Sequence, residues 1–378
     1  MVERIDLTRA DDPRDVVHRA VACLAQGGVV GLPTEAAYGL VACALRPEAV
    51  ARLRVLAAPA RAQVANPHGF PTLFLKGADE VADWANVPSE AGRRLARRAW
   101  PGPMTLILPV AEQGLARRLT PEVRSFLLTD GTIAVRAPGD PMVREILRLM
   151  PGPLVRSIAP AAGTLVGRVP VTADDLAEVE GLDMILDNGP TRLGGPATVV
   201  AVTPEGWEIA RPGVLSAQAL GRMAGTIILF VCTGNTCRSP MAEALCKARL
   251  ADRLGCRPDE LVGRGYVVQS AGVSAHDGMP AAAHAIDVVR SRGGSLDAHA
   301  SRRATAEMVR QADWIVAMTL DHLDALLDQV PEVADRARLL HPLGDDVADP
   351  IGSDRDVYLR TARDIEGYLA RLFDDLGF

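Results

Sequence analysis

The second half of the chain alternates short apolar runs with amphipathic segments. An unbroken apolar run, Ile227 to Val231, ends at Cys232, and a polar loop separates it from a helical pattern that Pro240 opens and that continues through Leu250. Further along, the pattern predicts strands at 266–269, 314–318 and 338–340 and helices at 280–292, 304–311, 322–329 and 354–376. Because strands and helices alternate, we expect a parallel α/β sheet with helices on both faces.

The first half contains the same kinds of element without strict alternation. Residues 13–26 show helical spacing, and Gly27-Gly28 closes this helix. Apolar runs typical of strands lie at 29–32, 104–109, 133–136, 185–189 and 197–200. We therefore expect an α/β sheet of mixed direction in residues 1–215. Residues 216–225, a short segment rich in small residues, are predicted to link it to a second domain, 226–378.

Length, composition and charge exclude several classes of protein function. The 378 residues suffice for two or three domains, and the net charge of −6 argues against a non-specific polyanion binder while allowing a local basic groove. Lys76 and Lys247 are the only lysines, so nearly all positive charge is arginine. The first residues lack a signal-peptide plan, and no apolar run approaches the roughly 18 residues that span a bilayer. We expect a soluble cytoplasmic protein without membrane contacts.

The six cysteines show no paired spacing typical of zinc sites, so no metal site is predicted. The loop after Cys232 instead combines a thiol with the features of an anion site. Loop amides and a helix N-terminus attract negative charge, and the same field favours the thiolate over the thiol. Arg238 offers a planar fork that matches two phosphate oxygens. A nucleophile and a phosphate site are thus predicted in one loop.

Residues 226–378 resemble the low-molecular-weight protein phosphatase family. The resemblance rests on these motifs: the run CTGNTCRSPMAE from Cys232 to Glu243, Ser270-Ala271-Gly272, His299 with Ser301-Arg302, and Asp349-Pro350. It implies a phosphorylated protein substrate and a phosphocysteine intermediate formed on Cys232, without a cofactor.

The chemistry of this family assigns roles to the matching residues. Arg238 and the backbone amides hold the phosphoryl oxygens, Ser239 favours departure of sulfur from the intermediate, and Asp349 protonates the leaving group and later activates water. The predicted phosphate-binding residues are Thr233, Gly234, Asn235, Thr236, Cys237 and Arg238. Asn235 is expected to adopt an unusual backbone conformation. Cys237 has two open interpretations, a partner for a reversible disulfide with Cys232 or a small buried residue.

Two positions bear on the choice of substrate. Tyrosine phosphatases of the family usually carry an aliphatic residue where this chain has Thr236, and aromatic residues after the Asp-Pro pair. The bacterial protein-arginine phosphatases share the threonine, whereas Ile351 departs from the phenylalanine that they tend to have. We therefore favour phosphoarginine over phosphotyrosine as the substrate.

Residues 8–215 resemble the threonylcarbamoyl-AMP synthase (YrdC-like) family. The motifs are PTEAAYGL at 33–40, WPGPMT at 100–105, AVRAP at 134–138, PATVV at 196–200 and RPG at 211–213. Members of this family condense threonine, bicarbonate and ATP into an adenylate that is used for tRNA modification.

Several polar positions of the synthase pattern are changed in this chain. The Lys-x-Arg pair is missing near residues 56–61, where Arg61 is the remaining cation. The positions of the Ser-x-Asn motif hold Ile158 and Pro160, and a serine expected before the Thr-Val-Val strand is Ala197. These changes favour a domain impaired in catalysis.

Five residues of the first domain remain candidates for binding a ligand: Thr34, Tyr38, Arg61, Arg136 and Arg211. They are equally compatible with a purely structural role. Three interpretations stay open for the domain. It is a degenerate scaffold, an active synthase that uses ATP with magnesium, or a module that binds RNA or a nucleotide and brings the phosphatase to it.

Overall fold

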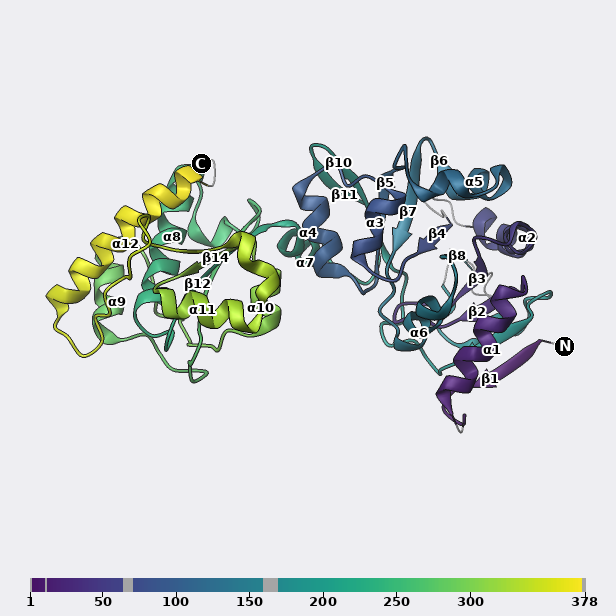
Figure 1. The fold of residues 1–378 in the computed structure, drawn as a ribbon, viewed down its shortest axis with the longest axis horizontal. Coiled ribbons are helices and arrows are strands. Elements are labelled where there is room, and N and C mark those ends of the chain that lie inside the picture. The colour runs from purple at the N-terminus through teal and green to yellow at the C-terminus, as the bar shows by residue number, and fades with distance from the viewer. Residues whose placement is uncertain (1, 11, 64–70, 159–168, 376–378) are drawn as a thin grey trace. The chain divides into compact units, whose positions relative to one another are not determined.

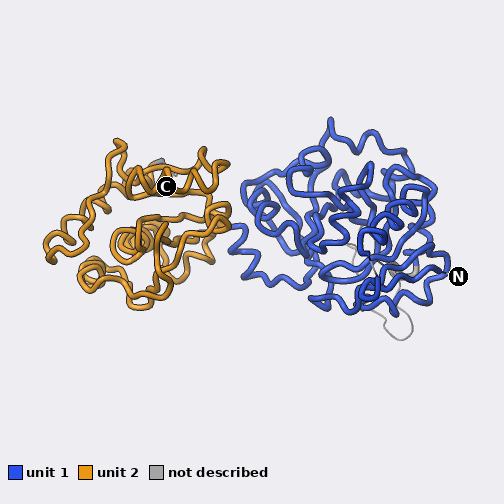
Figure 2. Tube along the Cα trace, turned by 60° about the horizontal axis from the view of Figure 1, so that its bottom comes forward, with its two compact units in different colours: residues 1–224 blue, residues 225–378 orange. Residues whose placement is uncertain are grey.

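The chain forms two compact units, residues 1–224 (unit 1) and 225–378 (unit 2), which Figure 2 colours separately. The computed structural model describes residues 2–10, 12–63, 71–158 and 169–375. The segment 216–225, predicted as a linker, contains helix α7 (Ala217–Ala224). Leu220 and Ala224 of this helix are buried in the core of unit 1. The boundary between the units therefore follows α7. Among the described residues, none of the helices has both the length and the apolar character to cross a bilayer.

Unit 1 is a mixed α/β domain (Figure 1). Its strands are β1 (Glu3–Asp6), β2 (Val30–Leu32), β3 (Gly39–Cys43), β4 (Thr72–Phe74), β5 (Met104–Pro109), β6 (Leu128–Thr129), β7 (Thr132–Arg136), β8 (Leu154–Ser157), β9 (Met184–Asp187), β10 (Thr198–Thr203) and β11 (Gly206–Arg211). Its helices, besides α7, are α1 (Pro13–Ala25), α2 (Pro47–Gln63), α3 (Val81–Trp84), α4 (Glu90–Ala99), α5 (Pro121–Leu127) and α6 (Pro141–Leu149).

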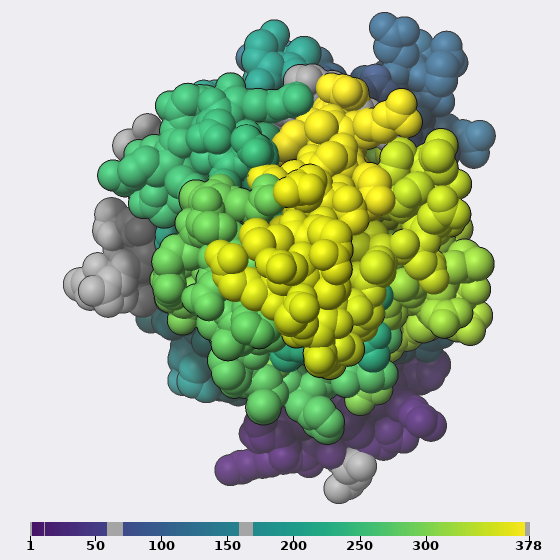
Figure 3. Space-filling view, turned by 90° about the vertical axis from the view of Figure 1, so that its left-hand side faces the viewer, coloured from purple at the N-terminus to yellow at the C-terminus, as the bar shows by residue number. Residues whose placement is uncertain are grey.

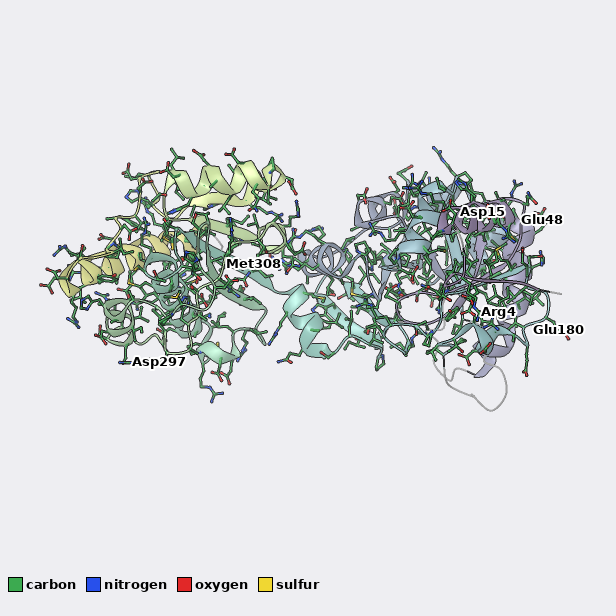
Figure 4. All side chains as sticks on the ribbon, turned by 90° about the horizontal axis from the view of Figure 1, so that it is seen from below. Arg4, Asp15, Glu48, Glu180, Asp297 and Met308 are labelled. Carbon is green, nitrogen blue, oxygen red and sulfur yellow. The ribbon has the colours of Figure 1, made fainter. Side chains whose placement is uncertain are left out.

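The strands of unit 1 pair in the order β1-β9-β2-β3-β8-β4-β7-β5-β10-β11, with β6 added beside β7. Parallel pairs such as β4–β7 and antiparallel pairs such as β3–β8 occur in the same sheet, which confirms the predicted mixed direction. The edge strand β1 is fixed to β9 by Arg4, labelled in Figure 4, whose guanidinium lies 2.6 Å from both Asp174 and Asp187.

Helices cover both faces of this sheet. Leu24 of α1 and Ile146 of α6 pack on one face, against Leu32 and Phe74. A second and larger core on the other face includes buried residues of α2, α4 and α5. The strands therefore form the interior layer, so polar groups at their ends are the ones left to contact a ligand.

Unit 2 is a parallel α/β domain. Its elements are β12 (Thr226–Cys232), α8 (Arg238–Leu254), β13 (Tyr266–Gly272), α9 (Ala283–Arg290), α10 (Ala306–Gln311), β14 (Trp314–Ala317), α11 (Leu320–Gln329), β15 (Ala337–Leu339) and α12 (Arg355–Asp375). The strand order is β13-β12-β14-β15, and all neighbours are parallel, as predicted. Helix α9 is shorter than the predicted 280–292, and α8 begins at Arg238 rather than at Pro240.

The central strand β12 is buried on both faces because helices cover each of them. Ile228 and Phe230 face a core shared with α8, α9 and α12, and Figure 3 shows α12 lying across one outer face of the unit. Leu229 and Val231 face a core shared with α10 and α11. This double burial explains the continuous apolar run, which is typical of the central strand of a parallel sheet.

Candidate active site

The loop after Cys232 lies at the carboxyl edge of the sheet in unit 2, between two neighbouring strands. Cys232 ends β12 and pairs in register with Gly272 at the end of β13. Helix α8 starts at Arg238, so Pro240 occupies the first helical turn, where a missing N–H leaves no hydrogen bond unmade. Strand, loop and helix N-terminus therefore follow one another within a few residues, as the sequence predicted.

The thiol of Cys232 is buried among hydrogen-bond donors. Its sulfur lies 3.0 Å from the Ser239 hydroxyl oxygen and accepts the backbone N–H of Asn235 at 3.3 Å. Ser239 is fully buried, and its one hydroxyl proton has the sulfur and the Ala271 carbonyl as possible acceptors. Donors directed at the sulfur stabilise a thiolate more than a thiol. The arrangement suits a nucleophile and, later, a leaving group.

Asn235 holds the loop in shape. Its backbone adopts the left-handed conformation with φ 54°, which asparagine tolerates better than most residues. The buried side-chain amide donates to the hydroxyls of Ser239 at 3.0 Å and Ser270 at 2.9 Å, and its oxygen accepts the N–H of Arg302 at 2.9 Å. The expected unusual conformation is therefore present, and the amide is well satisfied despite complete burial.

Gly272 lets the loop approach strand β13. A Cβ atom at this position would lie 2.4 Å from the Thr233 carbonyl oxygen and 2.9 Å from the Asn235 amide nitrogen. Both distances are too short for any side chain. The glycine of the Ser270-Ala271-Gly272 motif is thus required by contact with the loop.

The remaining loop amides have the features of an anion site. Within the part of the chain that the structure describes, the N–H groups of Gly234, Thr236, Cys237 and Arg238 have no hydrogen-bond partner. They lie at the N-terminus of α8, where the helix dipole adds positive potential. Such amides bind the oxygens of a phosphoryl group without further adjustment.

Arg238 and Asp349 meet across 111 residues of sequence. The Arg238 guanidinium donates to the Val347 carbonyl at 3.1 Å and to an Asp349 carboxylate oxygen at 2.5 Å. Arg238 is almost completely buried, whereas 39% of the Asp349 side chain is exposed. The other carboxylate oxygen accepts the N–H of Ile351 at 3.2 Å. A partly exposed carboxylate thus lies beside the Arg238 cation.

The two predicted specificity residues lie at different depths. Thr236 is half-buried, and its carbonyl accepts the N–H of Ala282 at 2.9 Å. Ile351 is 67% exposed and is free to contact a substrate. Cys237 is buried, with its sulfur 3.3 Å from the Tyr358 hydroxyl. Burial raises the pKa of Tyr358, and the hydrogen bond with Cys237 raises it further. This phenol therefore stays protonated.

His322 is a component of the site that the motifs did not reveal. Its ring nitrogens lie 2.8 Å from the hydroxyls of Thr233 and Thr319, and its side chain is buried. Burial lowers the pKa of His322, and the nearby Arg238 cation lowers it further. The ring is therefore neutral at neutral pH. Nothing in the spacing between Thr233 and His322 indicates this contact.

In unit 1, Thr34 and Tyr38 form hydrogen bonds within their own fold. The Thr34 hydroxyl donates to the Ala37 carbonyl at 2.7 Å and accepts two backbone N–H groups of the same turn. The Tyr38 hydroxyl donates to Gly189 at 2.7 Å and accepts from Asn188 at 3.0 Å, and burial raises its pKa to about 12. Both residues therefore shape the unit rather than present free groups to a ligand.

Arg136 is part of a buried ion pair, which agrees with the structural role that the sequence had left open for it. It donates to Glu35 at 2.7 Å and to the Gly102 carbonyl at 3.0 Å, and both side chains are nearly inaccessible. Glu35 is further held by the N–H groups of Gly139 and Asp140. Burying an unpaired charge is costly, and this pairing removes much of that cost.

Arg156 and Arg211 add two cations to this region. Burial lowers the pKa of Arg156 to about 9, and repulsion from the Arg136 and Arg211 cations lowers it in the same direction. The Nε atoms of Arg156 and Arg211 and the Ser157 hydroxyl are buried without a hydrogen-bond partner among the described residues. Gly39 makes room for Arg156, because a Cβ atom there would lie 2.4 Å from its Nε. Arg156 was missed at the sequence level.

Four further positions singled out in the sequence are Arg61, Ile158, Pro160 and Ala197. The side chain of Arg61, and Pro160, lie outside the part of the chain whose placement is described. Ile158 and Ala197 are buried apolar residues, as their side chains require.

Comparison with known proteins identifies relatives for both units. The family model of low molecular weight phosphotyrosine protein phosphatases matches residues 227–377, and the Sua5/YciO/YrdC model, described as telomere recombination, matches residues 22–213. A protein-arginine-phosphatase of Geobacillus stearothermophilus is 38% identical over 39% of this chain and 95% of its own length. The low molecular weight protein-tyrosine-phosphatase Etp of Escherichia coli (strain K12) is 42% identical over 30% of this chain and 67% of its own length.

For unit 1, a threonylcarbamoyl-AMP synthase of Pyrococcus abyssi is 32% identical over 55% of this chain, and the match spans 57% of the length of that synthase. Both predicted resemblances are thereby confirmed. The chain belongs to two families, joining a Sua5/YrdC domain to a low molecular weight protein phosphatase, and it is an enzyme of the phosphatase class.

Proposed function

We propose that unit 2 hydrolyses phosphoarginine on protein substrates through a phosphocysteine intermediate, with phosphotyrosine as the competing substrate. The observation that carries the proposal is the convergence of a thiol, an anion-binding loop and an acid. Cys232 receives donors from Ser239 and Asn235, and Arg238 holds Asp349 at 2.5 Å at the mouth of the same loop.

The proposed reaction has two steps. In the first, the Cys232 thiolate attacks phosphorus, an S–P bond forms as the bond to the leaving nitrogen breaks, and Asp349 gives that nitrogen a proton. In the second, Asp349 takes a proton from water, the resulting hydroxide attacks phosphorus, and the S–P bond breaks. Donation from Ser239 stabilises the departing thiolate. Arg238 and the loop amides hold the phosphoryl oxygens throughout, and no cofactor is needed.

Three observations support phosphoarginine over phosphotyrosine. The Thr236 hydroxyl gives the loop a polar group where an aliphatic side chain would suit a phenol ring. The residues after Asp349-Pro350 are Ile351 and Gly352, which offer no aromatic wall. The similarity of unit 2 to a protein-arginine-phosphatase over 95% of that relative's length agrees with this choice.

Replacing Thr236 with isoleucine is expected to shift preference towards phosphotyrosine. The change removes a hydroxyl that can bond to a guanidinium and adds apolar surface for a phenol, so the ratio of kcat/KM values for phosphoarginine and phosphotyrosine peptides should fall about tenfold. Steady-state kinetics on both peptides measures this ratio. Thr236→Ser, which keeps the hydroxyl, is the matched control. An unchanged ratio in Thr236→Ile would remove this residue as the selector.

For unit 1 we propose binding of a nucleotide without adenylate synthesis. Besides burial, repulsion from the Arg136 cation contributes to the lowered pKa of both Arg156 and Arg211, and among the described residues only Arg136 of these three is paired with a carboxylate, Glu35. Unpartnered donors on Arg156 and Arg211 suit phosphate oxygens. The changed synthase motifs and the internal hydrogen bonds of Thr34 and Tyr38 argue against full synthase chemistry, so ATP with magnesium is not assigned a reaction here.

Titration of the full chain with ATP tests this second proposal. Arg156→Gln should weaken ATP binding at least about tenfold because a charge-assisted contact is lost. Arg54→Gln, which changes an exposed arginine of α2, should leave it unchanged. Binding of a single-stranded oligoribonucleotide but not ATP would replace the nucleotide proposal by an RNA one. Release of pyrophosphate from ATP that depends on threonine and bicarbonate would show an active synthase instead.

A further inference from the structure

The contact between Thr233 and His322 is not used by the phosphatase mechanism. Thr233 follows the nucleophile directly, yet its side chain is exposed, whereas Asn235, Cys237, Arg238 and Ser239 are buried. An exposed group beside a buried thiol lies at the mouth of the loop. It is therefore accessible to the part of a substrate that projects from the loop.

Helix α11, which follows the neighbouring strand β14, holds the Thr233 hydroxyl in place through His322. Thr319 caps the helix and contacts one ring nitrogen of His322, while the other ring nitrogen contacts Thr233, both at 2.8 Å. The adjacent N–H of Leu320 donates to Asp346, in the segment that also carries Asp349. Helix α11, which carries His322, is thus bonded to the segment that also carries Asp349.

The hydrogen bonds that join Thr319, His322 and Thr233 leave the Thr233 oxygen able to accept another one. A neutral imidazole has one donor and one acceptor nitrogen, so Thr233 either gives its proton to the ring or accepts one from it. In either case the Thr233 oxygen retains at least one lone pair. A guanidinium presents only N–H donors, whereas a phenol ring presents none. A fixed acceptor at the mouth therefore discriminates between these two leaving groups.

We propose that Thr233, positioned by His322, is a second specificity residue, which accepts a hydrogen bond from the guanidinium of a phosphoarginine substrate. This inference rests on the proposed phosphoarginine activity. It adds a second recognition group to the same loop, three residues before Thr236. A site built to bond a donor group rejects a substrate that lacks the group, because the acceptor is then left unpaired. Thr233 acts on the substrate directly, and His322 acts through Thr233.

Kinetics of full-length variants on phosphoarginine and phosphotyrosine peptides tests the inference. Thr233→Val keeps the shape and removes the hydroxyl, and it should lower kcat/KM for phosphoarginine about tenfold, mainly through KM, while changing that for phosphotyrosine less than about twofold. Thr233→Ser should restore the preference. His322→Phe should give a smaller loss with the same selectivity, and the double variant should be no worse than Thr233→Val alone, because the two residues act as one unit.

The outcomes separate this inference from the proposed function. Equal losses on both peptides would show that Thr233 and His322 merely support the loop, and an unchanged phosphoarginine value in Thr233→Val would show that the hydroxyl does not touch the substrate. Either result in an enzyme that prefers phosphoarginine overturns the inference alone. A wild-type enzyme that prefers phosphotyrosine overturns the proposed substrate, and the inference with it.

Discussion

Replacement of Cys232 by serine is expected to abolish phosphatase activity. A hydroxyl at this position is a much weaker nucleophile than a thiolate, and the donors from Ser239 and Asn235 cannot make it an alkoxide at neutral pH. The loss in kcat should be at least about 10⁴-fold, as for removal of other enzymic nucleophiles. Hydrolysis of p-nitrophenyl phosphate by the full chain measures it directly.

Cys256→Ser is the matched control, since Cys256 is a half-buried cysteine just after α8. It should retain nearly full activity. The loop geometry of the Cys232→Ser protein is checked by competitive binding of inorganic phosphate, which should persist because the amides and Arg238 are unchanged. Substantial turnover by a Cys232→Ser protein that still binds phosphate would refute the phosphocysteine mechanism.

Asp349→Asn is expected to slow turnover by about 10² to 10⁴-fold for substrates with poor leaving groups. The amide retains the shape and the contact with Arg238 but cannot give up a proton to the leaving atom or take one from water. The effect on the first step should depend on leaving-group acidity, because an acidic phenol departs without help. Burst kinetics with dinitrophenyl phosphate and with phenyl phosphate separates the two steps.

Asp345→Asn provides the control for this substitution. Asp345 belongs to the same connection, and its side chain is 76% exposed. Its replacement should leave both steps unaffected. An Asp349→Asn protein that loses the same factor on both aryl phosphates in the first step would indicate that Asp349 orients Arg238 and is not the acid.

Local pattern predicted most strands and helices of unit 2 but only about a third of those of unit 1, because the order of apolar residues shows which face of an element is buried only where the pattern is regular. The double-sided burial of β12 follows from the unbroken run Ile227 to Val231. Helix boundaries were less accurate where tertiary contacts compete. The segment before α9 is held extended, since Ala282 donates to the Thr236 carbonyl and Met279 bonds to Ser301, so the helix begins at Ala283 rather than at 280.

The interpretation of unit 1 changed more than that of unit 2. Thr34, Tyr38 and Arg136 were compatible with ligand binding or with a structural role, because polar residues in a motif indicate either function or a demanding turn. The structure shows their hydrogen bonds satisfied within the unit. Arg156 gave no signal in its own neighbourhood. Its importance comes from the pairing of β8 with β3 and β4, which brings it near Arg136.

By itself, the sequence determined the catalytic loop, since nucleophile, amides and Arg238 lie within seven consecutive residues between a strand and a helix. Local chain geometry is sufficient to build such a site. Only the tertiary structure decided which distant groups complete it. Asp349 reaches Arg238, and His322 reaches Thr233, because parallel strands place their following loops at one edge of the sheet. The Asp-Pro motif had suggested the first contact, whereas nothing local to Thr233 or His322 encodes the second.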